Sequence, residues 1–142
     1  MSTAIFSRVL AEGGHAKERE LSPELATLLH ARYPLIFTHL PRVNCGDGWL
    51  DLLDALCESL QSETQNGGPQ VVAFEVKEKF GGLRFYTGAC NDVQRGMIGQ
   101  AQAFSWRICE VCANRGKTYG PTWFRTRCEA HEDPEKESGR LG

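Results

Sequence analysis

The sequence predicts an α+β protein in which amphipathic helices pack on a β-hairpin and a small cysteine-rich unit follows at the C-terminus. Three patterns support this. Apolar residues recur at helical spacing over residues 49–60, an alternating segment with a central Gly-Gly pair covers residues 71–88, and two Cys-x-x-ligand pairs lie near the end. The chain has 142 residues, enough to bury a core, and its net charge of −2 gives no general attraction to nucleic acid or anionic membrane.

The N-terminal part divides into a flexible arm, residues 1–20, and the start of a helical and β-hairpin core, residues 21–108. The first core helix begins at Ser22-Pro23, because Ser is a favoured N-cap and Pro suits the first helical position. It ends near Arg32, since a Tyr-Pro pair follows and a residue before Pro is pushed out of the α region.

Two more helices are predicted from apolar stripes with a period of 3.6 residues. Asp47 is expected to cap the first, which is typical of a core helix. Its stripe is Trp49, Leu52, Leu53, Leu56, Cys57 and Leu60. Asn91 and Asp92 are expected to cap the second, which leads directly into the first cysteine pair. Its stripe is Val93, Met97, Ile98, Ala101, Phe104 and Ile108.

The alternating segment between these helices predicts a β-hairpin. Val72, Phe74 and Val76 are expected to face the core, as a half-buried strand requires. Gly81-Gly82 is expected to supply the positive φ angles of the turn.

The opposite face of this hairpin is a candidate surface for a partner, together with residues of the C-terminal unit. The alternative is that its cations pair across the strands with Glu75 and Glu78. The predicted partner-binding residues are Lys77, Lys79, Arg84, Tyr86, Trp123, Arg125 and Arg127.

Residues 109–131 predict one closed zinc site, with one structural zinc ion per chain. Its ligands are Cys109, Cys112, Cys128 and His131. Ligands separated by two residues can both turn inward from one tight loop, and two such pairs supply a tetrahedron. Thiolates with one imidazole favour zinc over magnesium or calcium.

The backbone around the ligands predicts a treble-clef-like finger. The first pair forms a knuckle in which Asn114 is expected to take the left-handed conformation. A hairpin of residues 117–119 against 122–127 follows, and a short helix runs from Cys128 toward Glu137. Residues 132–142 are polar and predict a frayed tail.

The six cysteines also indicate a compartment. The sequence shows no secretory signal and no apolar run long enough for a membrane span, so we expect the cytosol, where metal binding is favoured over disulfides. Cys57 is expected to be buried on its helix, whereas Cys45 and Cys90 lie in loop-like segments without an assigned role.

Four features of the sequence form one pattern: KEKFGGLRFY at residues 77–86, CxxC at 109–112, Trp123, and CxxH at 128–131. This pattern resembles that of a group of short zinc-binding proteins of tailed phages and prophages. The resemblance covers residues 47–131. It implies a bacterial host cytosol and supports the zinc ligands, but brings no established activity. The chain departs from the group at Ala113, where Gly is usual, which concerns the backbone of the knuckle.

The functional prediction is a binding protein that docks on a host or phage macromolecule through the predicted surface. The phage setting suggests inhibition of a host enzyme or defence system. An alternative is nucleic-acid binding by the finger, where the aromatic residues Tyr119, Trp123 and Phe124 alternate with cations, a composition that strand-binding surfaces use. These cations are Arg107, Arg115, Lys117, Arg125 and Arg127.

A metal-dependent enzyme is the second alternative, and we expect no catalytic residues because four protein ligands close a zinc site. A Cys–His pair of Cys45 with His39 is a further arrangement that the sequence leaves open. Glu110 and Glu129 are expected to be solvent-exposed acids near the finger.

Overall fold

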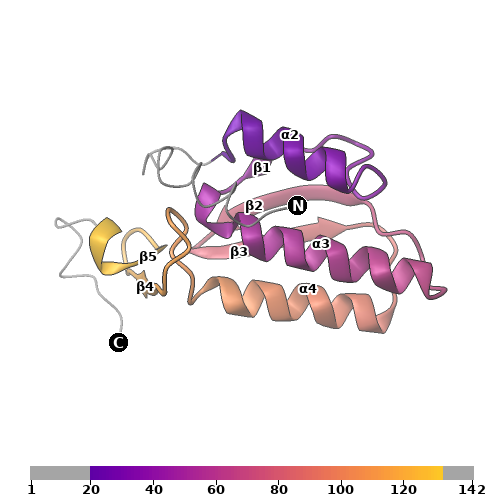
Figure 1. Cartoon of the computed structure of the whole chain (residues 1–142). Helices are drawn as coiled ribbons and strands as arrows, with labels where there is room; N and C mark the ends of the chain where they lie inside the picture. Colours follow the sequence, from indigo (N-terminus) through magenta and orange to yellow (C-terminus); the bar gives the residue numbers. More distant parts are fainter. Residues whose placement is uncertain (1–19, 133–142) are drawn as a thin grey trace.

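A computed structural model describes residues 20–132, and the predicted flexible arm and frayed tail lie outside this range except at their inner ends. The described chain is a mixed α+β fold of three α-helices and two small sheets (Figure 1). The helices are α2 (Pro23–Arg32), α3 (Leu50–Gln65) and α4 (Asp92–Ser105). None of them is long and apolar enough to cross a lipid bilayer.

The larger sheet has the strand order β1-β2-β3, with β1 (Val43–Asn44), β2 (Ala73–Lys79) and β3 (Gly82–Thr87). Strands β2 and β3 form the predicted hairpin, whereas β1 joins β2 in parallel from a segment that the sequence predicts as loop. Both edges are covered. The backbone N–H of Leu21 donates to Val43 of β1, and the N–H groups of β3 donate to side chains of α4.

The turn of the hairpin differs by one residue from the prediction. Phe80 and Gly81 have positive φ angles of 54° and 88°, and Gly82 is already the first residue of β3. Phe80 therefore takes a conformation that non-glycine residues rarely adopt, while its ring is 61% exposed.

The predicted alternation along β2 is interrupted by a β-bulge between Ala73 and Glu75. The bulge places two residues of β2 opposite one of β3, so Ala73 and Val76 are buried and Phe74 is exposed. Phe74 was predicted to face the core. This was wrong, because the extra residue at the bulge shifts the inward and outward alternation of the side chains by one position.

Helix α3 packs on α4, and their buried side chains with those of the sheet form one core (Figure 1). The stripe predicted for α3 is buried apart from Leu52, which is half-buried, and Cys57 is fully buried as expected. In α4, Asn91 forms a capping box with Gln94, but Val93 and Phe104 are exposed and Gln94 is buried instead. The Gln94 amide donates to the carbonyl of Pro69, which explains its burial.

Helix α2 has the predicted bounds, but Asp47 does not cap α3. Asp47 starts the short 3₁₀ segment η1 (Asp47–Trp49), and its carboxylate accepts a 2.8 Å hydrogen bond from the backbone N–H of Ser22. Because Ser22 is the N-cap of α2, Asp47 joins the start of α2 to the start of α3.

His30 of α2 predicts a pH dependence of stability. Its Nε2 is buried without a hydrogen-bond partner in the described chain, its ring centroid lies 4.9 Å from that of Phe37, and burial lowers its pKa. The unfolded chain, in which the pKa is about 6.5, then binds the proton more tightly, so stability falls as the pH drops below that value.

We expect the stability lost between pH 7.5 and 5.5 to be smaller in His30→Leu than in the wild-type chain, as measured by urea unfolding at both pH values. His39→Leu, a change of an exposed histidine, is the matched control. An equal loss in His30→Leu and the wild type would contradict this role of His30.

Candidate metal centre

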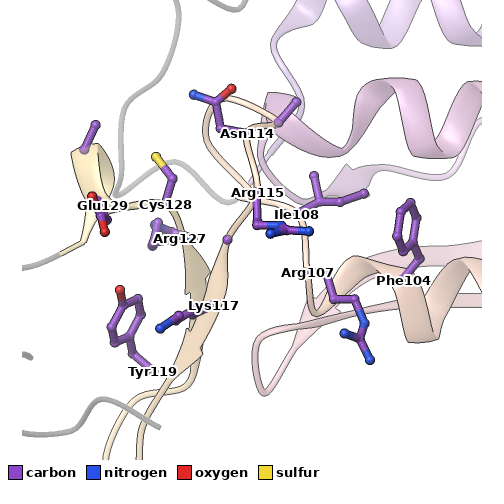
Figure 2. Close-up of a pocket in the computed structure, with 13 residues that line it drawn as sticks. Phe104, Arg107, Ile108, Asn114, Arg115, Lys117, Tyr119, Arg127, Cys128 and Glu129 are labelled. Carbon is purple, nitrogen blue, oxygen red and sulfur yellow. The ribbon is translucent and has the colours of Figure 1, made fainter. Parts of the chain in front are cut away.

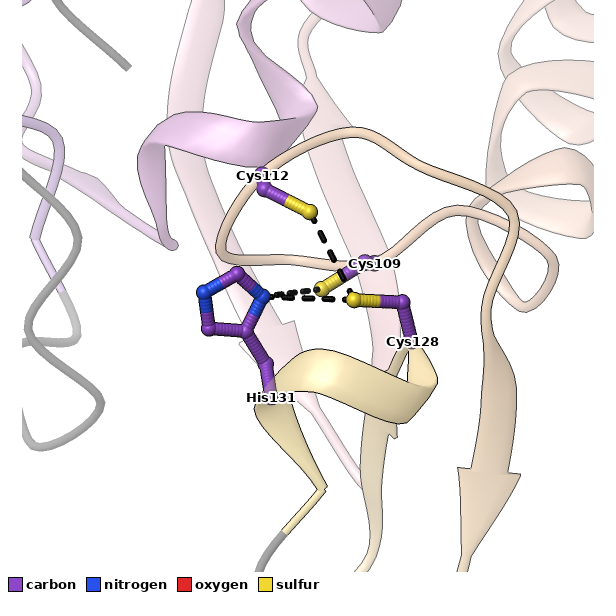
Figure 3. A group of neighbouring side chains, drawn as sticks. All are labelled: Cys109, Cys112, Cys128 and His131. Carbon is purple, nitrogen blue, oxygen red and sulfur yellow. Dashed lines mark hydrogen bonds between the residues drawn. The ribbon is translucent and has the colours of Figure 1, made fainter. Parts of the chain in front are cut away.

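Four donor side chains meet at one point of the C-terminal unit (Figure 3). They are Cys109, Cys112, Cys128 and His131, and their ligand atoms all lie within 4.8 Å of one another. The Sγ atoms of Cys112 and Cys128 are 3.6 Å apart, and Nδ1 of His131 lies 3.2 Å from Sγ of Cys128 and 3.8 Å from Sγ of Cys109. The four side chains could bind one metal ion, and they are the only such group in residues 20–132.

A tight turn after Ile108 positions the first two ligands. The N–H of Ala113 donates to the Cys109 carbonyl at 3.0 Å, and the N–H of Cys109 donates to the Asn114 carbonyl at 2.7 Å. Ala113, rather than Asn114 as predicted, has the positive φ, 74°. The positive φ angle therefore falls on the residue directly after Cys112. The sequence prediction placed it one position later, on Asn114, because Asn tolerates the left-handed conformation better than Ala.

A two-stranded sheet carries the second pair. It consists of β4 (Lys117–Tyr119) and β5 (Arg125–Arg127), paired antiparallel as the sequence predicts. Cys128 follows β5 directly, and the 3₁₀ segment η2 (Glu129–His131) turns His131 back toward it. The α-helix predicted from Cys128 toward Glu137 is not found at its start, because this single 3₁₀ turn ends at Glu132, which is extended, and the positions after 132 lie outside the described residues.

The thiols differ in acidity. Burial raises the pKa of Cys112 to about 12. Burial acts in the same direction on Cys128, but hydrogen bonds from the other two thiols and from backbone N–H groups outweigh it and lower the pKa of Cys128. Because metal ions bind thiolates, binding here must release protons, and the affinity should rise with pH.

A buried ion pair fixes the unit to the core. The Glu110 carboxylate accepts from Arg127 Nη1 at 3.1 Å and from the backbone N–H of Gly46 at 2.9 Å. Both side chains are almost fully inaccessible, 2% for Glu110 and 3% for Arg127. The prediction of Glu110 as a solvent-exposed acid was therefore wrong. Arg127 cannot present its charge to a partner or a nucleic acid, because Glu110 binds it in the interior.

Further hydrogen bonds join the same parts. The Trp49 indole donates to the Ile108 carbonyl at 2.9 Å, and the Thr126 hydroxyl donates to the Gly81 carbonyl of the β2–β3 turn at 2.7 Å. The cluster and the core are therefore held in one arrangement.

Gly48 makes the closest backbone approach at this junction. Its N–H donates to the Glu110 carbonyl at 2.8 Å, and a Cβ on Gly48 would lie 2.2 Å from the carbonyl oxygen of Cys109. Real Cβ atoms do not come so close to backbone oxygen, so the chain must shift to accept a side chain here.

Gly48→Ala is expected to destabilise the protein by at least about 1–3 kcal/mol, the usual cost of overpacking. Gly99→Ala is the matched control, because nothing lies within 4 Å of a Cβ at that helical position and Ala favours helix. Urea unfolding of both variants checks this. A loss no larger for Gly48→Ala than for Gly99→Ala would show that the junction is looser than described.

The predicted partner-binding residues other than buried Arg127 lie on the β2–β3 hairpin and on the adjoining part of the finger. Lys77 lies directly opposite Arg84, and Glu75 opposite Tyr86, on the face of the hairpin away from buried Val76 and Phe85. Glu75 pairs with Lys77 on its own strand at 3.4 Å, and the Glu78 carboxylate accepts from the N–H of Gly81.

The finger residues of the predicted surface adjoin the tip of this hairpin. The rings of Phe80 and Phe124 meet edge to face at 6.3 Å, and the Arg125 guanidinium lies 5.3 Å from the exposed Trp123 ring. Tyr119, one of the aromatic residues considered for strand binding, is buried, and its hydroxyl donates to Glu132 at 2.7 Å.

The Cys45–His39 pair is not assembled. The Cys45 thiol is fully buried, and burial together with the nearby carboxylates of Glu110 and Asp47 raises its pKa, the opposite of an activated nucleophile. His39 is exposed, and its ring stacks on Phe74 with centroids 5.2 Å apart.

These features define a small α+β protein with a three-cysteine, one-histidine cluster that could bind one metal ion. Comparisons with protein-family models, curated proteins and solved structures found no significant match. The resemblance to phage and prophage proteins therefore stays a prediction from the sequence motifs.

Proposed function

We propose that the chain is a zinc-stabilised binding protein whose metal has a structural role. The donor set carries this proposal. A zinc ion with Zn–S bonds of about 2.3 Å and a Zn–N bond of about 2.0–2.1 Å has tetrahedral edges of roughly 3.5–3.8 Å. Three of the six separations among the ligand atoms are 3.2, 3.6 and 3.8 Å, close to those edges, and all six are within 4.8 Å.

Four protein ligands leave no coordination position for a substrate, which is typical of structural zinc. The knuckle, the β4–β5 hairpin and the turn at His131 support a treble-clef-like finger. An enzymatic role would need an open metal position or a separate nucleophile and base, and the described cluster and Cys45 offer neither.

We propose that the protein acts by docking on a partner protein through the outward face of the β2–β3 hairpin and the adjoining tip. This face carries cations and aromatic side chains that are exposed or half-buried. Its residues are Lys77, Lys79, Phe80, Arg84, Tyr86, Trp123 and Arg125. Arg127 is left out because Glu110 binds it in the interior.

Two local features support a binding role for this face. Lys77 and Arg84 are directly opposite each other, and like charges in that position destabilise a sheet. Phe80 exposes an apolar ring from a strained turn position. Both features reduce the stability of the unbound chain locally. A partner with acidic groups and an apolar contact would offset this loss on binding. The phage setting, the host cytosol and inhibition of a host enzyme or defence system remain predictions from the resemblance.

Affinity capture from a bacterial lysate tests this proposal, with the wild-type chain, Arg84→Glu, Arg125→Glu and the control Arg95→Glu as bait. Arg95 is an exposed cation of α4, outside the β2–β3 hairpin and the finger. We expect a saturable partner with the wild type and the control, lost with the first two variants and weakened by salt. Recovery of the same proteins by all four baits would rule out this surface.

A further inference from the structure

A second basic surface lies on the finger, in a groove between the C-terminal end of α4, the knuckle and β4 (Figure 2). The groove has a volume of about 1190 Å³. Phe104 and Arg107 lie on its α4 side, and Lys117 and Tyr119 on its β4 side, with Arg115 between them (Figure 2). The groove therefore lies between the end of α4 and β4, and Cys128 of the metal cluster is among its lining residues.

The cations of this groove are available for a ligand. Arg107, Arg115 and Lys117 are exposed, and their side chains form no hydrogen bond or ion pair with any residue in the described range 20–132. Arg127 also lines the groove but is not available for a ligand, because Glu110 binds its guanidinium in the interior. Glu129 is the only acid among the lining residues. This local excess of positive charge stands out in a chain with a net charge of −2.

The groove also offers an aromatic ring. Phe104 was predicted as part of the buried stripe of α4, but it is 51% exposed and borders the groove beside Arg107. Every base has a flat π-face that stacks on such a ring without sequence preference. A row of cations with an exposed ring is the combination that single-strand-binding surfaces use.

We propose that this groove binds single-stranded nucleic acid, with Arg107, Arg115 and Lys117 contacting successive phosphates and Phe104 stacking on a base. Cations on opposite walls of a concave groove suit a thin, flexible strand, whereas a duplex needs a protruding element that enters its grooves. An acidic protein would use the charges but not require a flat ring face. This inference does not depend on the proposed partner surface of the β2–β3 hairpin.

Fluorescence anisotropy of the full, metal-loaded chain with labelled 12-nucleotide DNA and RNA strands of mixed sequence tests the proposal. We expect binding that weakens with salt, with a slope of log affinity against log salt near −2, since each of three phosphate contacts contributes about −0.7. Arg107→Ala with Lys117→Ala should reduce the slope by more than half. Phe104→Ala should weaken binding roughly tenfold with the slope unchanged.

Arg95→Ala on α4, an exposed cation outside both proposed surfaces, is the matched control and should leave binding unchanged, and circular dichroism with metal content verifies that each variant folds. The proposal is overturned by any of four results. These are no binding at low salt, affinity that is flat with salt, equal loss in Arg95→Ala, or equal binding of a duplex or of heparin, a polyanion without bases. A loss in Arg84→Ala with none in the groove variants would assign nucleic-acid binding to the hairpin face instead.

Discussion

Cys128→Ser is expected to abolish the ordered structure of residues 109–131. A structural zinc site contributes about 10–16 kcal/mol to the folding of a small finger, as much as the whole stability of a typical domain. The unit has little apolar core of its own. Its own buried cluster consists of Cys109, Val111 and Cys128, and two of these three residues are proposed ligands.

Amide hydrogen exchange measures this effect residue by residue. We expect amides of β4 and β5 to lose protection in Cys128→Ser, and in the wild-type chain after chelation, while amides in the middle of α3 keep theirs. Cys90→Ser is the control, because Cys90 is half-buried outside the cluster. Unchanged protection of β5 in Cys128→Ser would mean that the unit folds without its metal.

Glu110→Ala is expected to have the second-largest effect, a loss of roughly 3–5 kcal/mol, because it leaves the buried Arg127 charge without its partner. It also leaves the N–H of Gly46 without the acceptor that lies 2.9 Å away. Arg127→Met should cost less than Glu110→Ala, since it removes the charge and keeps most of the apolar volume.

Chemical unfolding of both single variants and of Glu110→Ala/Arg127→Met checks this prediction. The double variant should lose less free energy of unfolding than the two single variants together, because no buried charge is left unpaired. Glu129→Ala, an exposed acid of the same unit, should change stability by less than about 0.5 kcal/mol. Additive losses in the double variant would show that the two side chains do not interact.

Most of what the sequence predicted correctly depends on local patterns. Ser22-Pro23 and the capping box of Asn91 mark helix starts through hydrogen bonds and torsions within a few residues, and the structure begins α2 and α4 there. The four proposed ligands were grouped from their spacing alone, since two tight turns are enough to bring each pair together.

What the sequence could not indicate depends on contacts between distant residues. Strand β1 has two residues and is defined only by its pairing with β2, more than thirty positions away. Glu110 and Arg127 look like ordinary surface charges in sequence, and only their meeting in the interior makes them a pair. Phe104 fits the spacing of the buried stripe, but it is exposed because it lies at the C-terminal end of α4.

The metal content of the purified chain tests the central claim most directly. Native mass spectrometry, compared with the same sample under denaturing conditions, should show a mass difference of one zinc ion per chain, absent in Cys112→Ser and retained in Cys90→Ser. A native wild-type chain without zinc, or a Cys112→Ser chain that keeps it, would contradict the proposal that these four side chains form one structural zinc site.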